Sequence, residues 1–408
     1  MPNPKRLGNS YRRISMTLSA KQISSFVDQN KEEAIRCLQE ILQVPSVTGE
    51  EEAVSHVFEK WMTANGLPVE RIYGAPNRPN LLSEWKGTKE GKRFVFNGHM
   101  DVFPPDPKDP GKYGPWSGIV ADGHIYGRGA SDMKGGDAGA LMAVIFLKRM
   151  GFDPKGSILL SWMCDEENGS KLGAQYLLNN GYLRGDFGLC MEPCDGRLIP
   201  KHGGILRGHV TYTAEAQHTA AIYEHGDNAL EKAINVILEL KKINQRLLKV
   251  PAEGMPSPHL TVSILNSGEA ANVHPSKAVF WFDRRLVPGE DHDAALKEIV
   301  DVLETFKAKD PSYDYKLEIT NNRPLLDIPY DDPFIQLVAK SYKEVLDKDV
   351  VIAAKPGGSD ASWIRKITGM PIPNFGAANG YSEMGKPNEK IPVDRYLDFI
   401  KVYMMTVV

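Results

Sequence analysis

The apolar positions in the first part of the chain change repeatedly between helical and strand-like spacing. Periods of three to four residues predict helices, and short apolar runs that end in polar turns predict buried strands. In chain order the predicted elements are a helix at 20–46, a helix at 51–66, a strand at 93–101, a helix at 135–151 and a strand at 156–168. Strands that alternate with helices and end in polar groups predict an α/β domain with its site at the strand ends.

Around residue 204 the pattern changes to the alternation of half-exposed strands. The predicted elements there are a strand at 207–216, a helix at 228–243, strands at 259–266 and 278–286, a helix at 291–308 and a strand at 313–320. This β-α-β-β-α-β order is typical of a ferredoxin-like domain, whose sheet has one exposed face and edges open to pairing. The α/β pattern resumes at 332. We therefore predict one domain formed by 1–203 and 323–408, with a second domain, 204–322, inserted into it.

Composition and charge limit the partners. The chain has 408 residues, which favours two domains over one, and its formal net charge is −3. No basic surplus indicates nucleic acid or a membrane as a partner, and no apolar run approaches the roughly 18 residues of a spanning helix. The N-terminal segment is basic but has no hydrophobic core, so 1–16 is interpreted as a flexible arm and not as a secretory signal.

The four cysteines indicate the compartment. Cys190 and Cys194 are four residues apart, as in some metal-binding pairs, but no second Cys or His pair stands at zinc-ribbon spacing. Buried thiols in a reducing environment are the better interpretation, which predicts a cytoplasmic protein.

Acidic residues and one histidine stand at the ends of the predicted strands. His99 and Asp101 share one face of an extended segment, so the carboxylate can orient the imidazole. Neighbouring Glu166 and Glu167 point to opposite sides, so one can bind a metal while the other takes a proton from water. Taken singly, each is more often a satisfied histidine, a turn residue or a solvated strand end. Together they predict a metal site, and this set comprises His99, Asp101, Asp132, Asp165, Glu166, Glu167 and Glu192.

The motifs GHMDVFP, GRGASDMKGG, DEENGS and MEP, in this order, resemble those of the M20 family of metallopeptidases and amidohydrolases. That family includes acetylornithine deacetylase, succinyl-diaminopimelate desuccinylase and carboxypeptidase G2. The resemblance continues through AQHTAAIYEHGDNAL, ANVHPSKAVFWFDRRLVPGE, GGSDAS and PNE, and so covers nearly the whole chain. It implies a zinc-aminopeptidase-like catalytic domain with an inserted ferredoxin-like α+β domain that acts as a lid and forms a homodimer.

The resemblance also implies a role for each matched residue. His99, Asp132 and Glu192 would hold a first metal, and Asp132 would bridge to a second metal bound by Glu167. Asp101 would support His99, and Glu166 would be the general base. His218 would stabilise the oxyanion, in many members from the partner subunit. Asn272 and Arg285 would bind a substrate carboxylate, with Gly358 and Ser359 of GGSDAS also at the substrate. Two structural alternatives stay open, in which Arg285 pairs with Asp283 and His218 only caps a helix.

The chain departs from the family pattern at the second metal. The family places a histidine shortly before the closing PNE, and alignment on PNE puts Gly385 there, between Met384 and Lys386. Glu383 or another nearby group could supply the ligand, the second site could be weak or empty, or the protein could have kept the fold for binding alone. A weak or empty second site ranks first, and the retained Glu166, Glu167 and His218 argue against a loss of catalysis. One further hypothesis is that Lys386 replaces the second metal as a fixed positive charge.

A second departure concerns the substrate. Several amino-acid deacylases carry Arg after GGSDA, where this chain has Ser362. We therefore expect a zinc-, manganese- or cobalt-dependent hydrolase that cleaves an amide or related C–N bond of a small carboxylate-bearing molecule, in the N-acyl amino acid or dipeptide class. The alternatives are a mononuclear deaminase or amidohydrolase with a different substrate and a non-catalytic ligand-binding homologue. After substrate binding, the family's expected motion is domain closure about hinges near 203 and 322.

Overall fold

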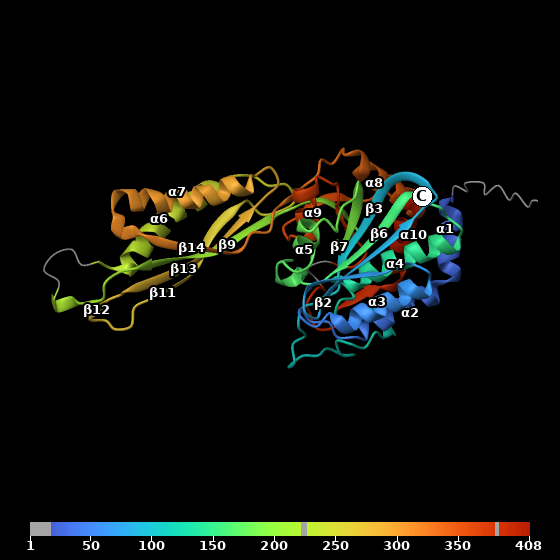
Figure 1. Ribbon diagram of the computed structural model, residues 1–408, viewed down its shortest axis with the longest axis horizontal. Helices are drawn as coiled ribbons and strands as arrows, with labels where there is room; N and C mark the ends of the chain where they lie inside the picture. The colour runs from blue at the N-terminus through green and yellow to red at the C-terminus, as the bar shows by residue number, and fades with distance from the viewer. Residues whose placement is uncertain (1–17, 222–226, 380–382) are drawn as a thin grey trace, which may run out of the picture.

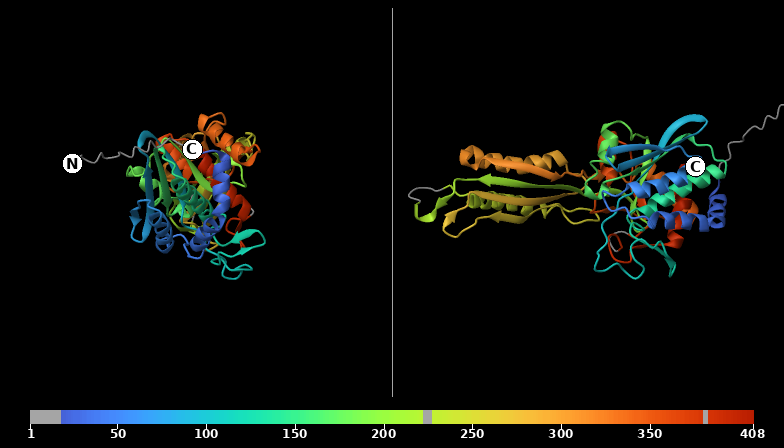
Figure 2. Two further views of the ribbon diagram at one scale, coloured as in Figure 1. Left: turned by 90° about the vertical axis from the view of Figure 1, so that its right-hand side faces the viewer. Right: turned by 60° about the horizontal axis from the view of Figure 1, so that its bottom comes forward.

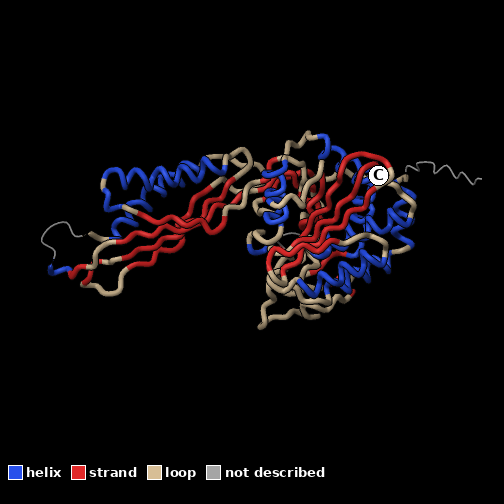
Figure 3. Tube along the Cα trace, in the orientation of Figure 1, coloured by secondary structure: helices blue, strands red, loops and turns tan. Residues whose placement is uncertain are grey.

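The computed structural model describes residues 18–221, 227–379 and 383–408 and has two lobes in an elongated arrangement (Figures 1 and 2). The larger lobe is a mixed sheet with helices packed against it, and the smaller lobe is a four-stranded sheet with two long helices on one face (Figure 3). The predicted arm at 1–16 lies outside the described residues. Within the described ranges, no helix is both long enough and apolar enough to cross a membrane.

The sheet of the larger lobe has the strand order β1-β2-β6-β3-β7-β17-β8-β15, and β16 also pairs with β8. Its strands are β1 (Glu70–Ala75), β2 (Arg78–Lys86), β3 (Lys89–His99), β6 (Lys155–Met163), β7 (Phe187–Pro193), β8 (Leu198–His202), β15 (Leu326–Asp327), β16 (Ile352–Lys355) and β17 (Asn374–Gly376). In the centre, β6, β3, β7 and β17 run parallel. Their carboxyl ends therefore meet at one edge of the sheet. A small separate sheet contains β4 (Val120–Ala121), β5 (His124–Tyr126) and β18 (Lys390–Pro392).

The three helices predicted in the first part of the chain are present, one of them divided in two, and the larger lobe has further helices that were not predicted. The helices of this lobe are α1 (Ala20–Gln29), α2 (Lys31–Leu42), α3 (Glu52–Ala64), α4 (Lys134–Arg149), α5 (Ala174–Asn179), α8 (Pro333–Leu346), α9 (Asp360–Thr368) and α10 (Val393–Val407). The single helix predicted at 20–46 is thus divided into α1 and α2. The division falls at Asn30, which leaves the helical conformation and donates its side-chain amide to the Phe26 carbonyl at 2.8 Å.

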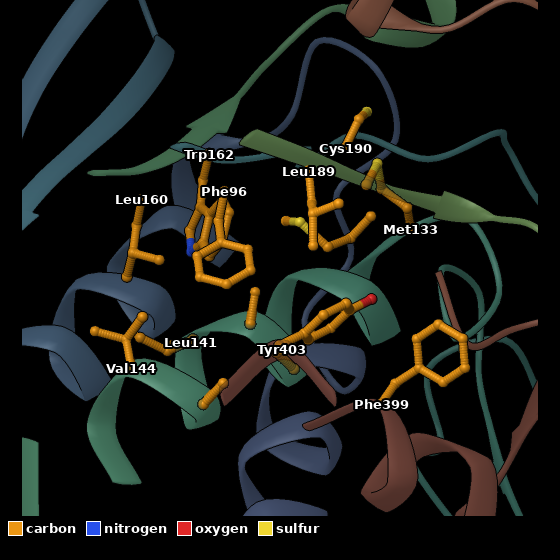
Figure 4. Packing of buried hydrophobic residues seen from close by; sticks show 14 of the residues in the cluster. Phe96, Met133, Leu141, Val144, Leu160, Trp162, Leu189, Cys190, Phe399 and Tyr403 are labelled. Atoms are coloured by element: carbon orange, nitrogen blue, oxygen red, sulfur yellow. The ribbon is translucent and has the colours of Figure 1, made fainter. Parts of the chain in front are cut away.

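The core of the larger lobe lies between the central strands and α4, with α10 behind it (Figure 4). Residues Lys134–Leu147 of α4 are all buried. Gly136 permits this close approach, because a Cβ there would lie 2.4 Å from the Met191 carbonyl oxygen of β7. The helix that follows the Asp132 turn is therefore held tightly against the strand that carries Glu192. All four cysteines are free and buried, and Cys190 is one of the core residues.

The smaller lobe has the predicted β-α-β-β-α-β order. Its main elements are β9 (Gly204–Thr213), α6 (Ala229–Leu247), β11 (His259–Ser267), β13 (Lys277–Leu286), α7 (His292–Lys309) and β14 (Tyr315–Asn321). The strand order β11-β13-β9-β14 is antiparallel throughout. Burial alternates strictly along β13, so α6 and α7 cover one face and the other face stays open (Figure 1). The predicted fold class, an α/β domain with an inserted α+β domain, is confirmed.

Three short 3₁₀ turns and a two-stranded ribbon complete the described fold. They are η1 (Glu166–Asn168), η2 (Thr219–Ala221), η3 (Pro311–Tyr313) and the ribbon of β10 (Gln217–His218) with β12 (Val273–His274). Only η1 belongs to the larger lobe. The ribbon lies at the far end of the smaller lobe, as the label of β12 in Figure 1 shows.

Candidate active site

Parallel neighbouring strands bring the predicted histidine and acids to one place. His99 is the last residue of β3, Glu192 lies at the end of β7, and Glu166 and Glu167 follow β6 in η1. Asp132 comes from the glycine-rich turn before α4. Two groups of possible ligand atoms result, each with all its atoms within 4.8 Å of one another: His99, Asp132 and Glu167, and His99, Glu166 and Glu192. The site is therefore built at the sheet edge where the sequence predicts it.

The His99 imidazole points one nitrogen at the acids and the other at the backbone. Nε2 lies 3.2 Å from Asp132 Oδ1 and 3.7 Å from Glu192 Oε1. Nδ1 lies 2.8 Å from the backbone carbonyl oxygen of Asp101. A proton on Nδ1 donates to that carbonyl, which leaves the Nε2 lone pair available for a metal.

The predicted support of His99 by Asp101 thus comes chiefly from its carbonyl group, because the nearest carboxylate oxygen lies 3.6 Å from Nδ1. The Asp101 carboxylate has a different role. It accepts hydrogen bonds from the backbone N–H groups of Glu166 and Glu167, at 3.1 and 3.2 Å, and from the Thr48 hydroxyl at 2.9 Å. Asp101 therefore fixes the turn that carries both glutamates.

The electrostatics of this acid cluster favour a bound cation. Burial raises the pKa of Asp101 to about 6 and that of Glu192 to about 7. Burial and the charge of Asp132 raise the pKa of Glu167 well above its usual value, and Glu167 Oε1 is buried without a hydrogen-bond partner among the described residues. Carboxylates that destabilise one another in this way are stabilised by a divalent ion. An imidazole with several carboxylates is a donor set that fits such an ion.

Two buried cations stand among these acids, and the sequence motifs do not include them. Lys355, at the end of β16, places Nζ 3.3 Å from Glu192 Oε2. Arg323, between β14 and β15, forms an ion pair with Glu166 Oε1, and its Nη2 donates to the Glu166 carbonyl at 2.8 Å. The only sequence signal for Lys355 is its position two residues before GGSDAS, and Arg323 has none.

The closing PNE motif has a structural task that sequence reasoning did not assign. Glu389 is buried, and its Oε1 accepts hydrogen bonds from the backbone N–H groups of Gly129, Ser131 and Asp132, each at 3.0 Å. Its Oε2 pairs with Arg128 at 2.6 Å. Glu389 therefore holds the turn that presents Asp132 to the site.

The loop before PNE gives no clear replacement for the missing histidine. Gly385 is exposed, with φ +71°, and a Cβ there would lie 3.8 Å from the ring of Phe103, two residues after Asp101. Glu383 belongs to neither ligand group. The Lys386 side chain is exposed and lines a surface depression with Tyr113, and no residue of the two ligand groups lines that depression. The hypothesis that Lys386 replaces a metal therefore finds no support, whereas Lys355 does stand beside a predicted ligand. Residues 380–382 of this loop lie outside the described residues.

His218 and Asn272 lie far from the acids of their own chain. They are exposed on the ribbon at the end of the smaller lobe (Figure 1), and Asn272 Nδ2 lies 3.1 Å from His218 Nε2. The Ala220 N–H donates to His218 Nδ1 at 3.1 Å, so His218 also caps a helical turn, as one alternative supposed. The structure thus brings this predicted pair together, but at a distance from the metal ligands.

The structure separates Asn272 from Arg285, its predicted partner in carboxylate binding. Arg285 pairs with Ile205 at the linker end of β13, and the strand from Lys277 to Arg285 is roughly 26 Å long at about 3.3 Å per residue. Within one chain the two cannot bind the same carboxylate. Arg285 also pairs with Asp283 at 2.6 Å, as the second alternative supposed.

The two residues of GGSDAS differ in their surroundings. The Ser359 hydroxyl is buried, donates to Asn374 Oδ1 at 2.8 Å and lies 3.2 Å from His202 Nε2. Its side chain is therefore engaged inside the protein, and only its backbone could face a substrate. Gly358 packs against the side chain of Arg323.

Comparison with known proteins gives matches over most of the chain. The model of peptidase family M20/M25/M40 matches residues 95–408. A succinyl-diaminopimelate desuccinylase of Methylorubrum populi is 32% identical over 372 residues, which are 86% of this chain and 92% of that protein. Aminopeptidase PepT of Bacillus cereus has a TM-score of 0.74 at 21% identity, over 93% of this chain and 98% of PepT. The Bacillus subtilis YXEP protein, a dinuclear metal-binding peptidase of the M20 family, has a TM-score of 0.69 at 15% identity, over 93% and 99% of the two chains.

Proposed function

Because this chain belongs to peptidase family M20/M25/M40 and is therefore a metallohydrolase that acts on C–N bonds, we propose that it hydrolyses the amide bond of a small carboxylate-bearing substrate of the N-acyl amino acid or dipeptide class. The observation that carries this proposal is the meeting of His99, Asp132, Glu167 and Glu192 beside Glu166 at one sheet edge. The desuccinylase relative, whose name denotes removal of an acyl group from an amino acid, supports the same substrate class.

The roles of the site residues follow from their positions. His99, Asp132 and Glu192, with Glu167, would hold the metal, which when bound polarises the scissile carbonyl and lowers the pKa of the attacking water. Glu166 takes a proton from that water while the water oxygen forms its bond to the carbonyl carbon. The same carboxyl then gives the proton to the nitrogen as the C–N bond breaks. Asp101 holds Glu166 in place through the backbone N–H.

A homodimer accounts for the distant pair at the ribbon. His218 and Asn272 would enter the site of the partner, where they would meet that chain's Arg285 and so reunite the predicted carboxylate-binding pair. An apolar surface supports this contact: Ile234 and Leu238 of α6 and Ile264 and Leu265 of the edge strand β11 are all exposed. An open edge strand beside an apolar helix face suits a symmetric contact.

The substrate class is tested with a panel of N-acetyl and N-succinyl amino acids, dipeptides and amino-substituted acids, assayed with added manganese, zinc or cobalt. We expect release of a free amino group from members of the first three classes only. Matched carboxamides, in which the substrate carboxylate is neutral, should react more slowly, because Arg285 loses its ion pair. Release of ammonia from the amino-substituted acids alone would indicate a deaminase instead.

The missing histidine leads to an expectation for metal content. After dialysis against metal-free buffer, we expect about one divalent ion per chain, measured by elemental analysis, because a structural or catalytic site needs at least three protein ligands. Among the described residues, Asp132 and Glu167 are the only groups that the family pattern leaves for a second ion. Gly385→His should raise the content toward two. Two tightly held ions in the unmodified protein would show that another group replaces the histidine.

A further inference from the structure

The open face of the smaller lobe carries a cluster of charged side chains at its linker end. Asp283 of β13 lies opposite Arg207 of β9, and Arg285 lies two residues further along β13. Arg207 donates from Nε and Nη2 to Asp283 Oδ2, at 2.8 and 2.6 Å. Arg285 donates from Nε to Asp283 Oδ1 at 2.6 Å. Two guanidinium groups therefore share one carboxylate.

This cluster has an excess of positive charge. Although burial acts in the opposite direction, hydrogen bonds from Arg207 and Arg285 hold the pKa of Asp283 below its usual value, so its carboxylate is ionised at neutral pH. Two positive charges then stand beside one negative charge. The neighbouring strand β11 places Thr261 opposite Asp283 and His259 opposite Arg285, and neither adds an acid. The cluster therefore attracts an anion.

Both guanidinium groups are open to a ligand. The side chain of Arg207 is 43% exposed and that of Arg285 is 37% exposed. Within the described part of the chain, no hydrogen bond occupies Nη1 of either arginine, because their bonds to Asp283 use Nε and Nη2. Each arginine thus has a free N–H donor, and a ligand can bind without displacing Asp283.

The cluster lies at the end of the smaller lobe that adjoins the acid site. Arg285 pairs with Ile205 across β13 and β9, and the Ile205 N–H donates to the Arg323 carbonyl at 2.9 Å. The Arg323 side chain in turn forms its ion pair with Glu166. The connection from Arg285 to the proposed base therefore passes through only two residues, whereas the ribbon with His218 lies at the opposite end of the lobe (Figure 1).

The spacing of the two arginines suits a substrate with two neighbouring carboxylates. Arg207 and Arg285 are diagonal neighbours on adjacent strands, with Cβ atoms about 7 Å apart, and their guanidinium groups meet at Asp283. The α-carboxylate and the side-chain carboxylate of aspartate or glutamate span a comparable distance and lie on one side of the amide bond. In an N-succinyl amino acid, by contrast, the scissile amide bond itself stands between the two carboxylates. The cluster therefore favours an acidic amino acid.

We propose that Arg207 is a specificity-determining residue that binds the side-chain carboxylate of an acidic amino acid, while Arg285 binds the α-carboxylate. This inference rests on the proposed function, in which Arg285 takes one carboxylate of the substrate. It narrows the substrate class to N-acyl or peptidyl derivatives of aspartate and glutamate. Asp283 is a positioning residue, because it holds the two guanidinium groups side by side.

The test compares substrates that differ only in the second carboxylate. The acyl group preferred in the panel is placed on glutamate and on glutamine, and kcat/KM is measured for both. We expect the unmodified enzyme to prefer the glutamate derivative by about tenfold, the lower end for a hydrogen bond to a charged group, because a half-exposed arginine is screened by water. Arg207→Met should remove this preference by slowing only the glutamate derivative. Arg207→Lys, which keeps the charge, should retain part of it.

The matched control is Arg246→Met, since Arg246 of α6 pairs with Glu298 on the helical side of the same lobe. This variant should keep the full preference. An equal loss for both derivatives in Arg207→Met would show that Arg207 only holds Asp283 and Arg285 in place, and would overturn the proposal. Equal rates for the two derivatives with the unmodified enzyme would overturn it without any variant, so the test does not depend on how Arg207→Met folds.

A second measurement needs no turnover. Glutamate and glutamine are titrated calorimetrically into the zinc-loaded protein, and we expect glutamate to bind about tenfold more tightly in the unmodified protein and in Arg246→Met, but not in Arg207→Met. Equal affinity of the unmodified protein for both amino acids, or a glutamate preference that persists in Arg207→Met, would show the proposal to be wrong. If no panel member is hydrolysed, the proposed function fails, yet this titration still decides whether Arg207 binds a second carboxylate.

Discussion

Replacement of Glu166 by glutamine should strongly reduce hydrolysis while the metal stays bound. The carboxylate is the predicted proton acceptor, and general acid–base catalysis contributes about 10²- to 10⁴-fold to such reactions, so kcat should fall by that factor. Glutamine keeps an oxygen that can accept the Arg323 hydrogen bond, so the buried guanidinium retains a partner. The measurements are kcat with the best substrate of the panel, metal content by elemental analysis and the midpoint of thermal unfolding.

Two comparisons separate loss of the base from other causes. Glu84→Gln removes a carboxylate of β2 that pairs with Arg93 of β3, outside the site, and should leave kcat unchanged. Glu192→Gln removes a proposed ligand and should lower both metal content and activity. If Glu166→Gln loses its metal as Glu192→Gln does, then Glu166 is a ligand, as the grouping of His99, Glu166 and Glu192 also allows. If it keeps most of its activity, another group is the base.

Much of the site can be predicted from sequence because it lies where neighbouring parallel strands end. His99 and Glu192 lie at the ends of buried strands and Glu166 follows one, and parallel strands bring their ends together without further information. The β-α-β-β-α-β order of the smaller lobe can be predicted equally well, because the spacing of apolar residues within each element indicates whether it is a helix or a strand. Local patterns of this kind lie within a window of ten to twenty residues and need no knowledge of the tertiary structure.

The long-range contacts around the site cannot be predicted in the same way. Arg323 and Glu166 are 157 residues apart, Lys355 and Glu192 are 163 apart, and Glu389 and Asp132 are 257 apart. No periodicity connects such pairs, because each arises only when separate elements pack. The break at Asn30 is not visible in the sequence for a different reason: its flanks have one continuous apolar period, whereas the break is a local change of the Asn30 backbone, accompanied by a side-chain bond to the Phe26 carbonyl.

The position of His218 leads to the sharpest test of the assembly. His218→Ala should lower kcat by about 10²- to 10³-fold, the usual effect of losing an oxyanion-stabilising donor. Since His218 lies at the far end of the smaller lobe, the proposed dimer supplies it to the partner's site. A chain with Glu166→Gln retains an intact His218, and a chain with His218→Ala retains an intact Glu166. In a mixed dimer, one of the two sites therefore contains both groups.

Mixing the two inactive variants, with exchange of subunits, should then restore activity to roughly a quarter of the unmodified level, because about half of the dimers are mixed and each has one complete site. The measurement is the specific activity of the mixture against time, with the oligomeric state followed by light scattering. Asn235→Ala, a change on α6 of the same lobe whose side chain bonds to Tyr313, is the control and should not reduce activity. Restoration requires that Glu166 and His218 act on one substrate from different chains. An inactive mixture in which subunits have exchanged would place both groups in the same chain, and closure of the lobes would then have to carry His218 across the length of β13.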